Sequence, residues 1–168
     1  MTQKITPFLW FDKNAEEAMN FYTGIFKSAK IVSIMRYPDG PLEGPMKGPM
    51  KGMEGKVLTA VFELEGQQFM CLDGGPVFKP TSATSFYVEC QDQAEVDYYW
   101  DRLTEGGNPT MQQCGWLMDK FGFSWQIIPT ALPKLLTDPD KAKSNRALQA
   151  MMKMKKIIVA DLESAANS

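Results

Sequence analysis

The sequence predicts an α+β protein with two tandem β-α-β-β-β modules followed by a C-terminal helical extension. Three observations support this prediction: a strand followed by a helix near the start, the same pattern 78 residues later, and a tail with helical periodicity. The first module spans residues 1–78, the second residues 79–130, and the helical tail residues 131–168. We expect these parts to form one compact domain overall.

The first module begins with a strand and an amphipathic helix. The run ITPFLWF is β-branched and aromatic, and NAEEAMNFYTGIF places its apolar residues at helical spacing. Asn14 is suited to cap this helix, and Glu17 completes a capping-box pattern in which its side chain reaches back to the cap amide. The runs KIVSIMRY, KVLTAVFEL and QQFMCL predict strands, and the intervening Glu65-Gly66 pair predicts a hairpin turn.

The second module repeats the first. At an offset of 78, Thr84-Ser85-Phe86 matches Thr6-Pro7-Phe8, Asp92 matches Asn14, and Glu95 matches Glu17. Two generic strand-helix units could agree by chance, but the matched cap and acid favour a duplication, as does the match of Phe21-Tyr22 with Tyr99-Trp100. PTMQQ, CGWLMDK and FSWQIIP then predict three shorter strands.

Two segments depart from the repeat. The Gly/Pro-rich stretch at residues 38–55, which contains GPMK twice, predicts a long loop, and either a lid over a pocket or a passive solvated insertion would have this composition. The tail predicts helices broken at Asp138-Pro139-Asp140 and near Lys155-Lys156. Its apolar stripe suits a core or a subunit contact better than a Met-rich ligand groove. The stripe consists of Leu148, Met151, Met152 and Met154.

The composition indicates a globular protein of the cytoplasm. The 44% hydrophobic content can supply a core, and a net charge of -2 without a basic stripe predicts no nucleic-acid partner. The start of the chain lacks a signal-peptide pattern, and no apolar run approaches the ~20 residues that span a bilayer, so we expect no membrane partner. Cys71, Cys90 and Cys114 lack C-x-x-C spacing, which argues against a disulfide framework or a structural zinc site.

The sequence contains no histidine, which restricts the chemistry severely. Ser-His-Asp, Cys-His and two-His-one-carboxylate mechanisms are all excluded. Asp73, Glu89 and Asp119 remain as acids or bases, although strand alternation more often directs such residues to solvent. Cys71 and Cys114 could act as nucleophiles only when deprotonated, and buried thiols are usually inert.

Four stretches carry a resemblance to a known family: ITPFLWFDKNAEEAMNFY, LDGGPVFKP, CGWLMDKFGFSWQIIPTAL and ALQAMMKMKKI. They resemble the PhnB-like group of the vicinal oxygen chelate superfamily, which also includes glyoxalase I, bleomycin-resistance proteins and extradiol dioxygenases. The resemblance covers nearly the whole chain and implies the glyoxalase/bleomycin-resistance/dioxygenase fold and a homodimer. Members of this group often carry the name 3-demethylubiquinone-9 3-methyltransferase.

In metal-dependent relatives each module supplies two ligands, one near the start of its first strand and one on its last strand. By the resemblance and the internal repeat, these positions are approximately Pro7, Met70, Ser85 and Gln126. A shift of one residue would bring in Thr6, Cys71 or Ile127. Neither set supplies a histidine or a carboxylate, so we expect no metal site of the family type.

We also expect no other cofactor. A conventional methyltransferase holds S-adenosylmethionine at a glycine-rich turn that follows a first strand and opens a helix. The only glycine-rich candidates are the GPMK loop and Asp73-Gly74-Gly75-Pro76, and neither has this position.

Gln126 interrupts the apolar run GFSWQIIP, and Met70 stands at the same place in GQQFMCL. The Gln126 amide either binds a carbonyl or hydroxyl of a ligand, or satisfies Ser85, Thr84 or backbone groups. Aromatic residues on the predicted strands either line a small-molecule pocket or fill the core. The ligand-binding residues that we predict are Trp10, Phe62, Met70, Ser85, Trp116 and Gln126.

These observations favour a PhnB-like protein that binds a small, partly aromatic molecule between its modules without a metal. The alternative is an enzyme of the same superfamily, a lyase, isomerase or transferase, in which Gln126 acts with a carboxylate or a cysteine. A third hypothesis is a structural protein whose C-terminal helices serve assembly. We expect the partners to be a small-molecule ligand and a second copy of the chain.

Overall fold

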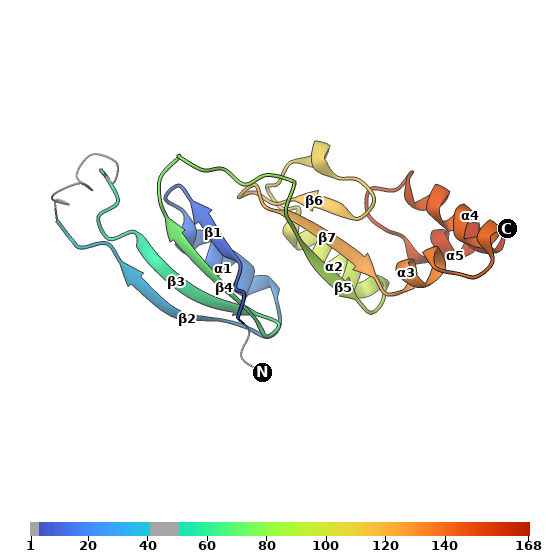
Figure 1. Ribbon diagram of the computed structural model, residues 1–168, viewed down its shortest axis with the longest axis horizontal. Helices are drawn as coiled ribbons and strands as arrows, with labels where there is room; N and C mark the ends of the chain where they lie inside the picture. Colours follow the sequence, from blue (N-terminus) through green and yellow to red (C-terminus); the bar gives the residue numbers. More distant parts are fainter. Residues whose placement is uncertain (1–3, 41–50) are drawn as a thin grey trace. The chain divides into compact units, whose positions relative to one another are not determined.

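The computed structural model describes residues 4–40 and 51–168. The contacts between residues divide the chain into two compact units, Met1–Pro80 and Thr81–Ser168. Within the described ranges, no helix combines the length and the apolar character that crossing a membrane requires. The mixed α+β class is confirmed, because each unit carries its own small sheet with helices packed on it (Figure 1).

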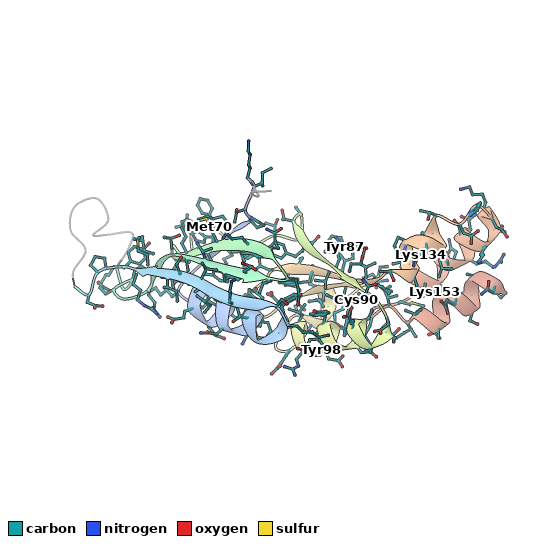
Figure 2. All side chains as sticks on the ribbon, turned by 90° about the horizontal axis from the view of Figure 1, so that it is seen from below. Met70, Tyr87, Cys90, Tyr98, Lys134 and Lys153 are labelled. Atoms are coloured by element: carbon teal, nitrogen blue, oxygen red, sulfur yellow. The ribbon has the colours of Figure 1, made fainter. Side chains whose placement is uncertain are left out.

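The first unit contains a four-stranded sheet and one helix. Its elements are β1 (Phe8–Phe11), α1 (Ala15–Ile25), β2 (Ala29–Arg36), β3 (Val57–Leu64) and β4 (Gln67–Asp73). The strand order is β1-β4-β3-β2, with β1 and β4 parallel and the other pairs antiparallel. Helix α1 packs on β3 and β4. The opposite face of the sheet carries Met70, as Figure 2 shows.

The hairpin predicted at Glu65-Gly66 is confirmed. Strand β3 ends at Leu64, β4 begins at Gln67, and both turn residues have positive φ, 46° for Glu65 and 80° for Gly66. Two consecutive left-handed residues match the right-handed twist of the flanking strands, which is why such turns join tight hairpins.

The start of α1 differs from the predicted cap. Asn14 precedes the helix but makes no side-chain cap hydrogen bond. Instead, the backbone N–H of Ala15 donates to Oδ1 of Asp73 at 2.9 Å. The end of β4 therefore supplies the carboxylate that satisfies the first turn, where free N–H groups and the helix dipole favour a negative charge.

The second unit has a three-stranded sheet in the order β5-β7-β6. Its elements are β5 (Ser85–Cys90), α2 (Gln93–Leu103), the 3-10 helix η2 (Pro109–Met111), β6 (Trp116–Met118), β7 (Ser124–Pro129), α3 (Ala131–Leu136), α4 (Lys141–Met151) and α5 (Val159–Asn167). The strand predicted at PTMQQ is wrong, because that segment forms η2. Proline fixes φ and lacks an N–H, and the Asn108 side chain caps the turn by accepting from Thr110 N–H at 3.0 Å.

The internal repeat holds for the helices and shifts by one residue in the strands. Both bounds of α2 lie 78 residues after those of α1. Phe8, however, is 50% exposed on β1, whereas its partner in the repeat, Phe86, packs on Trp125 with 5.0 Å between ring centroids. Phe8 lies opposite Met70 and Tyr87 lies opposite Gln126, so the strand register equates Phe8 with Tyr87. The residue equivalent to Ser85 is therefore Thr6, whose neutral hydroxyl supplies neither a histidine nor a carboxylate.

The C-terminal helices are an integral layer of the second unit. Their predicted breaks are confirmed, since Asp140 caps α4 by accepting from the N–H groups of Ala142 and Lys143, and α5 begins after Lys155-Lys156. The predicted apolar stripe divides between two environments. Met151 and Met154 pack against a buried cluster, while Leu148 and Met152 are exposed. That cluster consists of Ile128, Leu132, Ile157 and Leu162.

Candidate functional site

Gln126 lies at the centre of the open face of the second sheet. In the strand register it stands between Tyr87 on β5 and Trp116 on β6. Its neighbours on β7, Trp125 and Ile127, are buried on the other face, where α2 packs. Figure 2 shows Tyr87 and, on α2, Tyr98 on opposite sides of this sheet. Three side chains capable of hydrogen bonding therefore form one row across the face.

A pocket of about 250 Å³ lies between this row and the C-terminal helices. The sheet side of the pocket consists of Tyr87, Cys114, Trp116, Gln126 and Ile128. The helical side consists of Leu132, Pro133, Leu136 and Met151. No Asp, Glu, Lys or Arg among the described residues lines it, so its polar groups are an amide, a thiol, a phenol and an indole.

The Gln126 amide is half engaged. Its Nε2 donates to Ser85 Oγ at 2.8 Å. Ser85 is one of the partners predicted if the amide bonds within the protein. Its Oε1 accepts from no donor in residues 4–40 and 51–168. Every buried side-chain N or O atom of the described residues has a hydrogen-bond partner, so Oε1, which has none, is accessible. The amide thus offers a hydrogen-bond acceptor at the pocket, next to the contact that it makes with Ser85.

The tail holds the edge of the pocket through the backbone. Cys114 N–H donates to Met154 O at 2.8 Å, and Gly115 N–H donates to Lys155 O at 2.7 Å. Only glycine fits at 115, because φ is 84° and an added Cβ would lie 2.7 Å from Ile128 Cδ1. The Cys114 Sγ, 3.9 Å from Met152 Sδ, is held at the rim by this arrangement.

The other two cysteines do not suit nucleophilic chemistry. Burial raises the pKa of Cys71 to about 12, with a further contribution from the Asp73 charge. Burial likewise raises the pKa of Cys90 to about 12, assisted by nearby carboxylates. Both thiols therefore stay protonated near neutral pH and act as small core side chains. Burial, together with Glu89 and Cys90, also raises the pKa of the Tyr87 phenol, which stays neutral.

Two of the three candidate acids have structural roles, and neither is directed to solvent. Asp73 is 1% exposed and accepts from the backbone N–H groups of Ala15 and Val57. Asp119 is 2% exposed. Its carboxylate accepts from Phe121 N–H at 2.9 Å, Phe123 N–H at 3.0 Å and Trp125 Nε1 at 2.8 Å. Glu89 is exposed, as strand alternation predicts.

The structure brings together three of the six predicted ligand-binding residues: Ser85, Trp116 and Gln126. The other three lie in the first unit. Phe62 is fully buried and stacks between Tyr22 and Phe69, so it belongs to the core under α1. Trp10 donates from Nε1 to Gly75 O at 2.9 Å and packs edge-on against Phe78. Met70 lies on the open face of that sheet.

The positions at which relatives hold a metal do not fit one. Pro7 has no side-chain donor, and Thr6, which the strand register puts in its place, offers only a neutral hydroxyl. The Met70 thioether is soft, and Ser85 and Gln126 bond to each other. In the described part of the chain, no group of three or more His, Cys, Asp or Glu side chains is placed to hold an ion.

The glycine turn after β4 does not fit S-adenosylmethionine. A Cβ on Gly74 would overlap the Trp10 ring, and Gly75 O accepts from Trp10 Nε1. These glycines therefore serve packing inside the first unit. The tandem GPMK stretch lies largely outside the described residues, and the lid hypothesis with it. The base of that loop is fixed by Tyr37 N–H, which donates to Lys56 O at 2.9 Å.

Two sheets of the β-α-β type, each covered by a helix on one face, define a protein of the glyoxalase/bleomycin-resistance/dioxygenase fold. Residues 3–128 match the family described as 3-demethylubiquinone-9 3-methyltransferase. The chain belongs to this family, within the vicinal oxygen chelate superfamily that its sequence resembles. The match ends before the ALQAMMKMKKI stretch of the tail. Comparison with curated proteins finds no match.

Solved structures agree with this assignment. A putative 3-demethylubiquinone-9 3-methyltransferase, PhnB protein, from Bacillus cereus is 43% identical, with a TM-score of 0.64, over 76% of this chain and 100% of that chain. A Pseudomonas aeruginosa protein is 22% identical, with a TM-score of 0.57, over 76% and 98%. A FosX mutant from Listeria monocytogenes, complexed with Mn(II) and a dihydroxypropylphosphonic acid, is 16% identical, with a TM-score of 0.50, over 74% and 90%. The last two show the fold alone.

Sequence reasoning missed most of the pocket. Tyr87 had a signal, since it alternates with Phe86 and therefore faces the same side as Gln126 once their strands pair. The residues of the helical side had no such signal in the sequence. The apolar periodicity of α3 indicates that one face of the helix is buried, but it does not indicate which part of the protein covers that face. Cys114 was considered only as a nucleophile.

Proposed function

We propose that this chain is a PhnB-like vicinal oxygen chelate protein that binds a small, partly aromatic molecule without a metal. The observation that carries the proposal is the pocket of the second unit, in which Trp116 and Tyr87 flank the Gln126 amide. Apolar and aromatic walls with few polar groups are typical of small-molecule sites. The free Oε1 of Gln126 gives such a molecule a point of recognition.

The donor chemistry supports binding without a metal. Each hard divalent ion that relatives could hold needs oxygen or imidazole ligands, with carboxylates to balance the charge. Ser85 and Gln126 are neutral and already bonded to each other. The further donor side chains on the pocket wall are the Cys114 thiol, the Tyr87 phenol and the Met151 thioether, and none of them is a carboxylate or an imidazole.

The test is a thermal-shift screen of the full chain with one-ring and two-ring aromatic compounds, repeated with and without EDTA. We expect hits whose stabilisation is insensitive to EDTA and lost in Trp116→Ala, while Phe8→Ala, a half-exposed aromatic of the first unit, keeps them. Stoichiometric Zn, Fe, Mn or Ni in protein purified without chelators would contradict the proposal. Turnover of a hit that disappears in a folded Gln126→Ala variant would favour the enzyme alternative.

We further propose a homodimer in the cytoplasm. The exposed side chains of Leu148 and Met152 on and beside α4 give an apolar surface suited to a second copy. Three unpaired cysteines are in keeping with a reducing compartment. Sedimentation analysis at micromolar concentration checks the first point, and a monomer there would refute it.

A further inference from the structure

The helical side of the pocket comes from a part of the chain that the family match leaves out. Residues 129–168 follow the matched range, and they supply Leu132, Pro133, Leu136 and Met151. The Bacillus cereus structure is matched in full by 76% of this chain, so about a quarter of this chain has no counterpart in it. The wall that closes the pocket is therefore additional to the shared modules.

This wall is firmly attached. Gln93 on α2 donates from Nε2 to Ile157 O at 3.2 Å and accepts from Val159 N–H at 2.8 Å. Lys156 pairs with Asp97 at 2.7 Å, and the backbone of Cys114 and Gly115 bonds to the same segment. Helix α3 follows β7 directly and packs on it. The volume between the sheet and the helices is thus set by the fold of one unit.

The chemistry of the lining restricts what this volume can take. An ionised ligand would lose hydration without meeting any opposite charge, because no charged side chain among the described residues lines the pocket. An arene can contact Tyr87 and Trp116 on the sheet side and Leu136 or Met151 on the helical side. About 250 Å³ suits one or two rings.

The free acceptor adds a requirement. One N–H of Gln126 Nε2 donates to Ser85, so the acceptor left for a ligand is Oε1, beside the second N–H of Nε2. A ligand group that donates a hydrogen bond satisfies it, whereas an ether or a hydrocarbon leaves it unpaired once water is displaced.

We propose, building on the function proposed above, that the pocket takes an uncharged arene of one or two rings whose hydroxyl or amino group donates to Oε1 of Gln126, with α3 and α4 limiting its size. The test is calorimetric titration of the full chain at neutral pH with three probes of one ring system. They are 2-naphthol, which donates; 2-methoxynaphthalene, which does not; and 2-naphthoate, which is ionised. We expect 2-naphthol to bind about fivefold to tenfold more tightly than either of the others.

Two pairs of variants locate the binding. Gln126→Met keeps the side-chain length but removes the acceptor, so it should lower 2-naphthol affinity to that of 2-methoxynaphthalene, whereas Gln68→Met, at an exposed position of β4, should leave the ratio unchanged. Leu136→Trp should abolish binding of 2-naphthol while phenol still binds. Gln149→Trp, at an exposed position of α4 outside the pocket lining, should change neither.

The outcomes separate this inference from the proposed function. Equal affinity for the three probes, or a preference that survives Gln126→Met, overturns the assigned ligand class. Undiminished 2-naphthol binding in Leu136→Trp overturns the role of the helices. Binding of other aromatic compounds without any of the three naphthalenes overturns the inference alone, and failure of every aromatic compound tested overturns the proposed function as well.

Discussion

At the scale of single residues, the buried carboxylate of Asp119 organises the turn between β6 and β7. It accepts three hydrogen bonds, two from backbone N–H groups and one from Trp125, within residues 119–125. Asp119→Ala should lower the free energy of unfolding by about 3 kcal/mol, because buried donors are left without partners. Urea denaturation followed by tryptophan fluorescence measures this, with Glu89→Ala, at an exposed position, as the control that should change little. A loss below about 1 kcal/mol would show that water replaces the carboxylate.

The three thiols should differ in reactivity. Cys71 and Cys90 are 0% exposed and have a pKa of about 12, whereas Cys114 lies at the rim of the pocket. We expect a thiol reagent at pH 8 to modify Cys114 alone in the native protein and all three cysteines in guanidinium chloride, as counted by mass spectrometry. Rapid modification of Cys71 or Cys90 in the native state would mean that these cores open frequently.

The same pKa values predict how stability depends on pH. The two buried thiols keep their protons in the folded state up to about pH 12, while an exposed thiol of the unfolded chain has its ordinary pKa of 9.0. The unfolded state is therefore increasingly favoured as pH rises above 9. Urea midpoints measured between pH 8 and pH 10.5 should fall more steeply in the wild type than in a Cys71→Ala/Cys90→Ala variant, and parallel curves would contradict the assignment.

Residue-level properties were the least predictable from sequence. Alternation along a strand placed Glu89 correctly on the surface, but it could not foresee the burial of Asp73 and Asp119. Asp73 accepts from backbone N–H groups of two distant segments, and Asp119 accepts from backbone N–H groups of its own turn. Ser85 was one of the partners that the sequence offered for the Gln126 amide, and it lies on β5, the strand next to β7. The free oxygen of Gln126 and the neighbouring Tyr87 required the strand register.

At the scale of elements, two glycines with open space around them should respond oppositely to alanine. Gly24 lies inside α1 and Gly66 in the β3–β4 turn, and no atom lies within 4 Å of a Cβ built at either. Gly24→Ala should stabilise by about 0.5–1 kcal/mol, because alanine favours the helix. Gly66→Ala should destabilise by about 1 kcal/mol, because φ of 80° is strained for alanine. Urea midpoints compare the two, and changes of the same sign would contradict this argument.

Element positions were largely predictable, because each depends on local chemistry. The helix of each module, the Glu65-Gly66 hairpin and the breaks at Asp138-Pro139-Asp140 all follow from caps, turn residues and periodicity. The predictions of elements were wrong where a residue distant in sequence supplies a hydrogen bond, or where a capping residue next to the segment was not recognised. Asp73 replaces Asn14 at the start of α1, and Asn108 turns the expected PTMQQ strand into η2.

At the scale of the whole molecule, the chain combines family modules with a tail that the family match does not include. Ile157 and Leu162 of the tail are 0% exposed and pack with Ile128 of β7, so the tail shares a core with the second sheet. Two residues of that core, Ile128 and Leu132, also line the pocket, so the stability of the tail and the shape of the site are coupled.

That coupling can be measured at Ile157. The Ile157 side chain is fully buried and packs closely against Gly115, where an added Cβ would lie 3.2 Å from it. Ile157→Ala leaves a cavity there, so we expect a loss of about 2–4 kcal/mol in the free energy of unfolding. Gln149→Ala, at an exposed position of the same helical layer, should cost less than about 1 kcal/mol. Circular dichroism in urea gives both values. Since Ile157 lies beside the segment that bonds to Cys114 and Gly115, its truncation should also weaken ligand binding in the pocket. A small effect on both readouts would show that the tail is peripheral to the second unit.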